Sequence, residues 1–131
     1  ANIKYLPERT GRRDERTMNK LKLDHIGLNA ANKGEALVLA QTFCQLLGCC
    51  IDEKPASVYA GPSIEVMAGG GRGTKGHLGF ATEDLQGTIG EFKARGISFD
   101  ESSGKYTSEG KLRLIYLKDE LAGFAIHLME K

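Results

Sequence analysis

The chain has 131 residues, of which 18 are basic, 17 are acidic and 40% are hydrophobic. This length suits one domain whose core needs no disulfide or metal support. The near-neutral charge, without interleaved aromatic and basic residues, argues against nucleic-acid binding. No apolar run in the sequence reaches the length of a membrane span or resembles a secretory signal, so we expect a cytoplasmic protein without membrane partners.

Residues 1–20 differ from the rest of the chain. Charged side chains crowd between Glu8 and Arg16 with almost no apolar periodicity, which is typical of a solvated arm or linker. An alternative is an extra strand laid against a partner by the apolar residues of this arm, Ile3, Tyr5 and Leu6. The chain begins at Ala1, which is compatible with a piece of a longer protein, with processing, or with an internal start at Met18.

The first half of the chain predicts one strand, a helix and three further strands. The opening strand spans 23–30 (LDHIGLNA). A helix follows from the N-cap Asn32, with Glu35 placed as in a capping box, to the stop signal Gly48. Short strands are expected at 49–52, 57–61 and 64–67.

The three cysteines, Cys44, Cys49 and Cys50, are odd in number and two are adjacent. This usage favours reduced thiols over a disulfide framework. Their spacing is also wrong for a zinc knuckle, so we expect structural or incidental roles.

A glycine-rich run at 68–76 separates the two halves. We interpret it as a flexible hinge, and a role as a lid over a site is open to such a loop. Its backbone N–H groups are also suited to cradling phosphate, assisted by Arg72 and Lys75. The GxxxxGK[ST] pattern of a nucleotide-binding loop is absent from the sequence, however.

The second half repeats the plan of the first. A strand is predicted at 76–82, a helix at 84–95, and strands at 97–100, 112–117 and 124–129. The sequence therefore predicts an α+β fold of two tandem βαβββ modules, at about 21–68 and 76–130, within one domain spanning 21–131.

The two halves open on related strands, one beginning with His25 and the other with His77, each followed by an aliphatic residue and a glycine. Because successive side chains of a strand point to opposite faces, both histidines lie opposite the apolar residues of their strands. Glu65 and His127, in the last strands of the two halves, are also out of phase with their apolar neighbours. Curling the two sheets together would bring three imidazoles and a carboxylate into one place, a donor set that suits a first-row divalent metal.

This arrangement resembles the vicinal oxygen chelate superfamily, which includes glyoxalases, bleomycin-resistance proteins and extradiol dioxygenases. The resemblance rests on the segments LDHIGLNA, IEV, GHLGFAT and AIHLME, and it covers about 21–130. It implies paired βαβββ modules that form a cupped mixed sheet around a metal, with the helices outside. Carried over residue by residue, the family's metal ligands fall on His25, Glu65, His77 and His127.

One position departs from the family's pattern. The final strand usually carries a glutamate where this chain has His127, and in glyoxalase I-like members that glutamate also acts as a base. The replacement removes a negative charge, which favours ionisation of a bound water and tighter binding of an anionic oxygen substrate. It leaves Glu65 as the only matched carboxylate, which is a ligand, a base, or both in turn.

The resemblance implies chelation of a substrate through neighbouring oxygens. We expect a metal-dependent isomerase or lyase, with Glu65 as catalytic residue, that acts on a small, oxygen-rich, anionic substrate through a metal-stabilised enediolate. The donor set suits zinc, nickel, iron, cobalt or copper and disfavours magnesium. Tyr59 and Arg113 alternate away from apolar neighbours and are candidate substrate-binding residues.

Two alternatives stay open. One is a non-catalytic ligand-binding protein like the antibiotic-sequestering members, although those tend to lack the metal ligands. The other is an accessory module of a larger enzyme such as a sugar-acid aldolase. Dioxygenase chemistry is less expected than isomerase or lyase chemistry. Members of this family commonly pair, so we expect a homodimer, and the sequence leaves open whether one chain or two supply the ligands.

Overall fold

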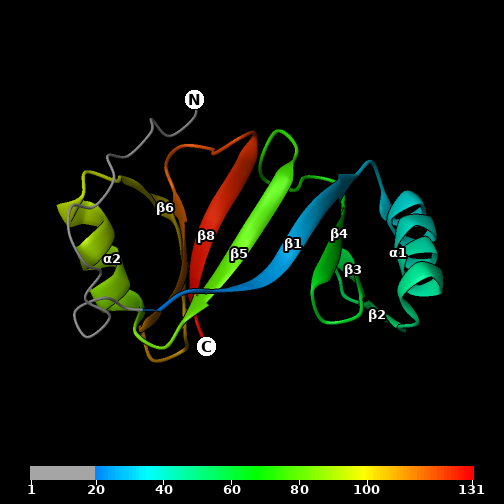
Figure 1. Cartoon of the computed structure of the whole chain (residues 1–131), viewed down its shortest axis with the longest axis horizontal. Coiled ribbons are helices and arrows are strands. Elements are labelled where there is room, and N and C mark those ends of the chain that lie inside the picture. Colours follow the sequence, from blue (N-terminus) through cyan, green and yellow to red (C-terminus); the bar gives the residue numbers. More distant parts are fainter. Residues whose placement is uncertain (1–19) are drawn as a thin grey trace, which may run out of the picture.

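The computed structural model describes residues 20–131, so the predicted arm lies almost wholly outside the described residues (Figure 1). Its elements follow one another in the predicted order, strand, helix and three strands, twice over. They are β1 (Lys22–Ala30), α1 (Lys33–Leu47), β2 (Ile51–Glu53), β3 (Ser57–Ala60), β4 (Ile64–Ala68), β5 (Gly76–Thr82), α2 (Leu85–Ala94), β6 (Phe99–Tyr106), β7 (Leu112–Leu117) and β8 (Phe124–Glu130).

All strands join one mixed sheet in the order β2-β3-β4-β1-β5-β8-β7-β6. At its centre β1 and β5 run antiparallel, and each pairs in parallel with the last strand of its own half, β4 and β8 respectively. Figure 1 shows α1 and α2 flanking the sheet at opposite ends of the molecule. The predicted α+β fold of two βαβββ modules is therefore confirmed.

Helix α1 begins and ends where its capping residues predict. The Asn32 side chain accepts a hydrogen bond from the Glu35 N–H at 2.9 Å, and Gly48 closes the helix in the left-handed conformation with φ 70°. The helix packs on β3 and β4 through small residues. The buried core under it consists of Ala30, Ala36, Ala40, Cys44, Val58, Ala60 and Val66.

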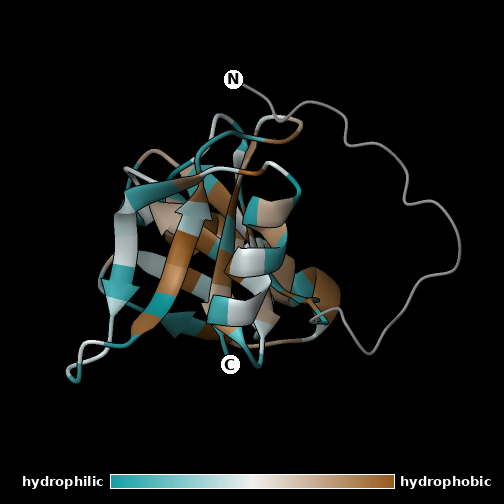
Figure 2. Ribbon diagram, turned by 90° about the vertical axis from the view of Figure 1, so that its left-hand side faces the viewer, coloured by the Kyte–Doolittle hydropathy of each residue, from teal (hydrophilic) through white to brown (hydrophobic). Residues whose placement is uncertain are grey.

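Helix α2 covers a second core on the other half, with Asp84 as its N-cap. This core consists of Leu85, Ile89, Phe99, Ile115, Leu117, Ile126 and Leu128. In Figure 2 the deepest hydrophobic colouring runs along strands in the interior. Within residues 20–131 no helix combines the length and the apolar character needed to cross a bilayer.

Strand β6 differs from the prediction, which placed a short strand at 97–100. The strand spans Phe99–Tyr106 instead, because its pairing with β7 resumes at Lys105 after an irregularity that follows Asp100. Its polar segment ESSGK has no apolar alternation, and within it the Ser103 hydroxyl accepts a hydrogen bond from the Tyr116 N–H of β7 at 2.9 Å.

The glycine-rich segment connects β4 to β5, as predicted, and several of its glycines adopt positive φ angles. Its backbone is held at three points. Asn29 Nδ2 donates to the Gly73 carbonyl at 2.9 Å. The N–H and the hydroxyl of Thr74 both donate to the Glu120 carboxylate. The Lys75 N–H donates to the Gly123 carbonyl. The connector is thus attached to both halves of the sheet.

Candidate metal site

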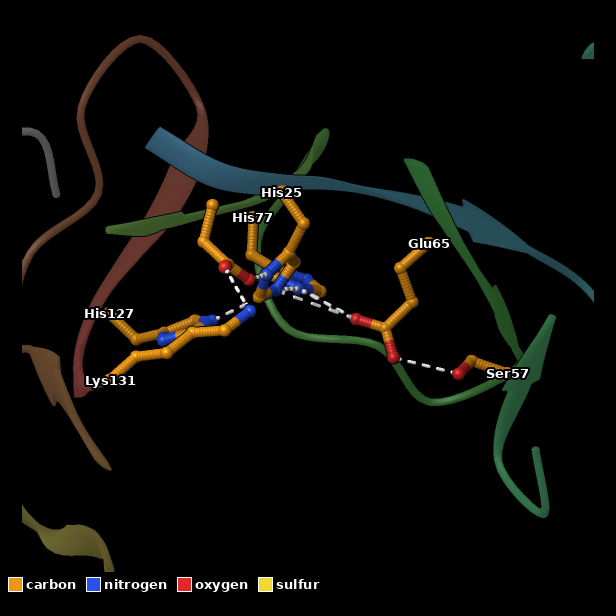
Figure 3. Close-up of polar contacts among 7 residues, drawn as sticks. His25, Ser57, Glu65, His77, His127 and Lys131 are labelled. Atoms are coloured by element: carbon orange, nitrogen blue, oxygen red, sulfur yellow. Dashed lines mark hydrogen bonds and ion pairs between the residues drawn. The ribbon is translucent and has the colours of Figure 1, made fainter. Parts of the chain in front are cut away.

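Four adjacent strands at the middle of the sheet carry the four predicted ligands on one face. Glu65 lies on β4, His25 on β1, His77 on β5 and His127 on β8. The strand registers align them, because Gly27 of β1 pairs with both Glu65 and His77. The prediction that these side chains converge is met within a single chain (Figure 3).

The ring nitrogens of the three histidines point to one place. His25 Nε2 lies 3.2 Å from His77 Nε2 and 3.2 Å from His127 Nε2. Glu65 Oε1 lies 3.2 Å from His77 Nε2 and 3.7 Å from His25 Nε2. The three histidines are only 5%, 3% and 2% exposed, so the cluster is shielded from water.

These distances fit a metal ion. A tetrahedral zinc with ligand distances of about 2.0–2.1 Å holds its ligand atoms about 3.3–3.4 Å from one another. The separations of His25 Nε2 from His77 Nε2 and from His127 Nε2, and of Glu65 Oε1 from His77 Nε2, are each 3.2 Å and lie close to that value. A set of three imidazoles and one carboxylate also matches the donor preference of zinc and its first-row neighbours.

Solved structures share this fold. Methylmalonyl-CoA epimerase from Mycobacterium tuberculosis is 18% identical, with a TM-score of 0.58, and the match covers 82% of this chain and 86% of that one. A hypothetical protein from Bacillus halodurans is 18% identical at a TM-score of 0.57, over 86% and 95%. Streptomyces coelicolor methylmalonyl-CoA epimerase in complex with 2-nitronate-propionyl-CoA is 13% identical at 0.53, over 83% and 96%. No protein-family model and no curated protein sequence matches the chain.

The epimerases among these structures belong to the vicinal oxygen chelate superfamily. The chain has the vicinal oxygen chelate fold. The fold expected from the motif resemblance is thereby confirmed. A shared fold at this level of identity does not carry an activity with it, so the function of this chain is argued from its own side chains.

Asp24 orients His25. The Asp24 Oδ2 atom accepts a hydrogen bond from His25 Nδ1 at 2.7 Å, while Lys131 Nζ donates to Oδ1 at 2.7 Å. Burial raises the pKa of Asp24, but the bonds from Lys131 and His25 outweigh burial and keep it below the ordinary value. Because an ionised carboxylate only accepts, the His25 proton sits on Nδ1 and the Nε2 lone pair faces the cluster.

An irregularity in β1 accompanies the contact between the adjacent residues Asp24 and His25. The register of β1 against β5 shifts between Leu23 and His25, and such a bulge re-aims the side chains next to it. By contrast, the Nδ1 atoms of His77 and His127 are buried without a hydrogen-bond partner among the described residues. Those two rings therefore lack a hydrogen bond that would fix them from the Nδ1 side, which is the kind of bond that orients His25.

Glycines make room for the imidazoles. A Cβ atom added to Gly27 would lie 2.0 Å from the ring of His77, and one added to Gly79 would lie 2.4 Å from His25 and 2.7 Å from His127. Each glycine of the repeated His-aliphatic-Gly motif is the cross-strand neighbour of the other motif's histidine. The motif is thus explained by ring packing across the β1–β5 pair.

Glu65 presents one oxygen to the cluster and has the other one fixed. Its Oε2 atom accepts a hydrogen bond from Ser57 Oγ at 2.7 Å. Burial raises the pKa of Glu65, but the hydrogen bonds from His77 and Ser57 outweigh burial and lower the pKa overall. The carboxylate is therefore ionised at neutral pH, and its Oε1 atom faces the histidines.

His127 is held neutral. Burial, followed by the charges of His25 and His77, lowers its pKa to about 3. A neutral imidazole keeps a lone pair for a metal ion, which a protonated one does not. The residue that departs from the family pattern thus has the electronic state of a ligand.

The two predicted substrate-binding residues have different outcomes. The Tyr59 ring centroid lies 6.2 Å from that of His25, and Tyr59 lines a cavity of about 350 Å³ beside this histidine. Burial and then the Glu65 charge raise the pKa of Tyr59 to about 12, so its hydroxyl stays protonated and is able to donate. Tyr59 therefore lies beside the histidine cluster and faces a cavity.

Arg113 is not brought to the site, and that prediction is corrected. It shares a face of β7 with Ile115 and Leu117, which pack under α2. The opposite face carries Tyr116, which pairs with His127 in register and has its ring centroid 5.0 Å from that histidine. Tyr116 was missed, because both faces of β7 are apolar and alternation alone does not show which one turns inward.

Proposed function

We propose that this chain is a metal-dependent isomerase-type enzyme that removes and returns a proton at a carbon next to a carbonyl of a small, oxygen-rich, anionic substrate. The observation that supports it is the convergence of three buried imidazoles, whose candidate ligand atoms lie within 4.8 Å of one another, with a carboxylate oxygen 3.2 Å from His77 Nε2 and 3.7 Å from His25 Nε2. Fold neighbours that are epimerases are compatible with this reaction class.

In this proposal His25, His77, His127 and Glu65 hold the ion. Zinc, nickel, iron and cobalt all suit the donor set, which contains too few oxygens for magnesium. When bound, such an ion supplies Lewis-acid stabilisation of the negative charge that develops on the substrate oxygens. With three neutral ligands and one anionic ligand, the loaded site keeps a positive charge, which favours an anionic substrate.

Glu65 is the proposed proton acceptor. Its carboxylate is ionised and faces the cluster, whereas Asp24 is turned to Lys131 and the outer nitrogen of His25. The Ser57 hydrogen bond holds Oε2 in place, so that Oε1 is the oxygen presented to the site. The Tyr59 hydroxyl is protonated and serves as a donor to a substrate oxygen beside His25.

Proton exchange tests this proposal without knowledge of the natural substrate. The metal-loaded protein is incubated in deuterated water with 2-oxo acids, 2-hydroxy aldehydes and malonyl-type acyl thioesters, and deuterium uptake next to the carbonyl is followed by NMR. We expect uptake with at least one class. Glu65→Gln should slow it by about 10²–10⁴-fold, whereas Glu109→Gln, in an exposed turn, should leave the rate unchanged.

The alternatives predict other outcomes. A lyase would cleave the substrate as well as exchange its proton for deuterium. Tight binding of one compound without any exchange would contradict the enzyme and favour a non-catalytic binding domain. Metal binding with neither result would favour an accessory module of a larger enzyme.

We further propose a cytoplasmic homodimer. Cys44, Cys49 and Cys50 are free thiols in the structure, which suits a reducing compartment. The α1 side chains Leu46 and Leu47 are 77% and 62% exposed, and pairing of two chains would cover such apolar area. Sedimentation equilibrium should give twice the chain mass of 14.2 kDa, and the mass of a single chain would contradict the dimer.

A further inference from the structure

A second cavity adjoins the metal site on the side of His77. Its volume is about 390 Å³. It lies between the glycine-rich connector and the polar middle of β6, and it is lined by Tyr116, whose ring centroid lies 5.0 Å from that of His127. Its lining includes Met67, Arg72, His77, Ser103, Lys105 and Tyr116.

The charged side chains that line this cavity are all positive. Arg72 and Lys105 line it, and no carboxylate does. The cavity beside His25, in contrast, mixes Asp24 and Asp52 with two lysines. Among residues 20–131 the Lys105 ammonium has no hydrogen-bond or ion-pair partner, so its charge is available to a ligand.

Arg72 is fixed in position from two sides. One guanidinium nitrogen donates to Asp100 Oδ2 at 3.0 Å, and the guanidinium carbon lies 4.2 Å from the ring centroid of Tyr116. Asp100 is itself bound by the N–H and the hydroxyl of Ser102, at 3.1 and 2.6 Å. Because one of five guanidinium donors is used by Asp100, the others remain for a ligand.

The fixed cation suits recognition of an oxyanion. A planar guanidinium that is already stacked and bonded loses little freedom on binding a carboxylate or a phosphoryl group. Gly70, on the same connector as Arg72, also lines the cavity, and the space beside its Cα is open, because a Cβ there would meet nothing within 4 Å. A second anionic group of a substrate therefore fits here, while the oxygens near its reacting carbon face the histidines.

We propose that the cavity between the connector and β6 is a specificity subsite, in which Arg72 and Lys105 bind a second anionic group of the substrate, a carboxylate or a phosphoryl group. The inference rests on the proposed metal site, and it narrows the substrate class to molecules with an anionic group beyond the chelating oxygens. Arg72 acts through direct contact, and Asp100 is a positioning residue.

Three hydroxamates test the subsite separately from the metal centre. Acetohydroxamate offers only the chelating group, malonomonohydroxamate adds a carboxylate, and phosphonoacetohydroxamate adds a phosphonate. Calorimetry on the zinc-loaded protein should show at least one of the two anionic compounds binding about tenfold or more tightly than acetohydroxamate. Which of the two gains more distinguishes a carboxylate from a phosphoryl substrate.

Two variants and one control locate the effect. Arg72→Gln and Lys105→Gln should each remove most of this preference while leaving acetohydroxamate affinity and zinc content unchanged. Arg113→Gln, which removes one positive charge from the opposite face of the sheet, should keep the preference. Equal affinity of the wild-type protein for all three compounds would overturn the subsite while sparing the metal site. Failure of all three hydroxamates to bind would overturn both the subsite and the metal site.

Discussion

At the scale of single residues, the site depends on glycines without a Cβ atom as much as on the ligands. Gly79 lies between His25 and His127, where a methyl group would come within 2.4 and 2.7 Å of the two rings. Both rings are buried and have little room to yield. Sequence inspection found the repeated His-aliphatic-Gly motif, but only the strand register shows why the glycine is required.

Gly79→Ala should therefore displace the ligands. We expect the metal content to fall from about one ion per chain to a small fraction of that value, measured by mass spectrometry on folded protein. Gly90→Ala is the matched control, because a Cβ at Gly90 meets nothing within 4 Å and alanine favours a helix by about 0.5–1 kcal/mol. Full metal content in Gly79→Ala would show that the rings are free to move.

Asp24 is the second residue whose role is clear only in three dimensions. Asp24→Asn should lower metal affinity by about 10–100-fold, since carboxylates that orient metal-bound histidines contribute about that much. Competition with a chromophoric chelator measures the change. Asp100→Asn removes a carboxylate away from the histidines and should leave the affinity intact. Unchanged affinity in Asp24→Asn would remove Asp24 from the site.

At the scale of elements, alternation located most of the site. His25, His77 and His127 were placed correctly because the apolar residues of their strands mark the buried face. Arg113 was misplaced because β7 has apolar residues on both faces, so its inward side is set by pairing with β8. The length of β6 was not predictable either, since its polar segment has no apolar alternation and its pairing with β7 is irregular between Asp100 and Lys105.

The contact between the end of β8 and the start of α2 gives a pH prediction. Glu130 accepts hydrogen bonds from Lys111 Nζ at 2.5 Å and from the Leu85 N–H at 3.1 Å. The hydrogen bond from Lys111, followed by the one from Leu85, lowers the pKa of Glu130 in the folded protein. In acid, Glu130 is therefore protonated to a greater extent in the unfolded chain than in the folded one. The contribution of this contact to the free energy of unfolding is therefore present above about pH 4.5 and is lost as the pH falls below it.

Denaturant titration across pH 3–7 measures this contribution. Glu130→Gln should be less stable than the wild-type protein at pH 7, and the difference should shrink towards pH 3. Glu109→Gln, in the exposed turn between β6 and β7, should show no such convergence. A constant difference between Glu130→Gln and the wild-type protein at all pH values would contradict the assignment.

At the scale of the whole molecule, the β1–β5 pair is what completes the site. It joins the two modules edge to edge, so that ligands from positions 25, 65, 77 and 127 meet in one chain. The sequence showed two modules with complementary ligands, but not whether they close on each other or on a second chain. One ion per chain is therefore expected whatever the oligomeric state.

Metal content of the purified protein is the most direct test of this account. Mass spectrometry should find close to one zinc, nickel, iron or cobalt ion per chain, with the ion lost in both His25→Ala and His127→Ala and retained in Arg113→Gln. Absence of any metal after reconstitution with all four ions, or full occupancy in the histidine variants, would contradict the metal centre and the chemistry proposed for it.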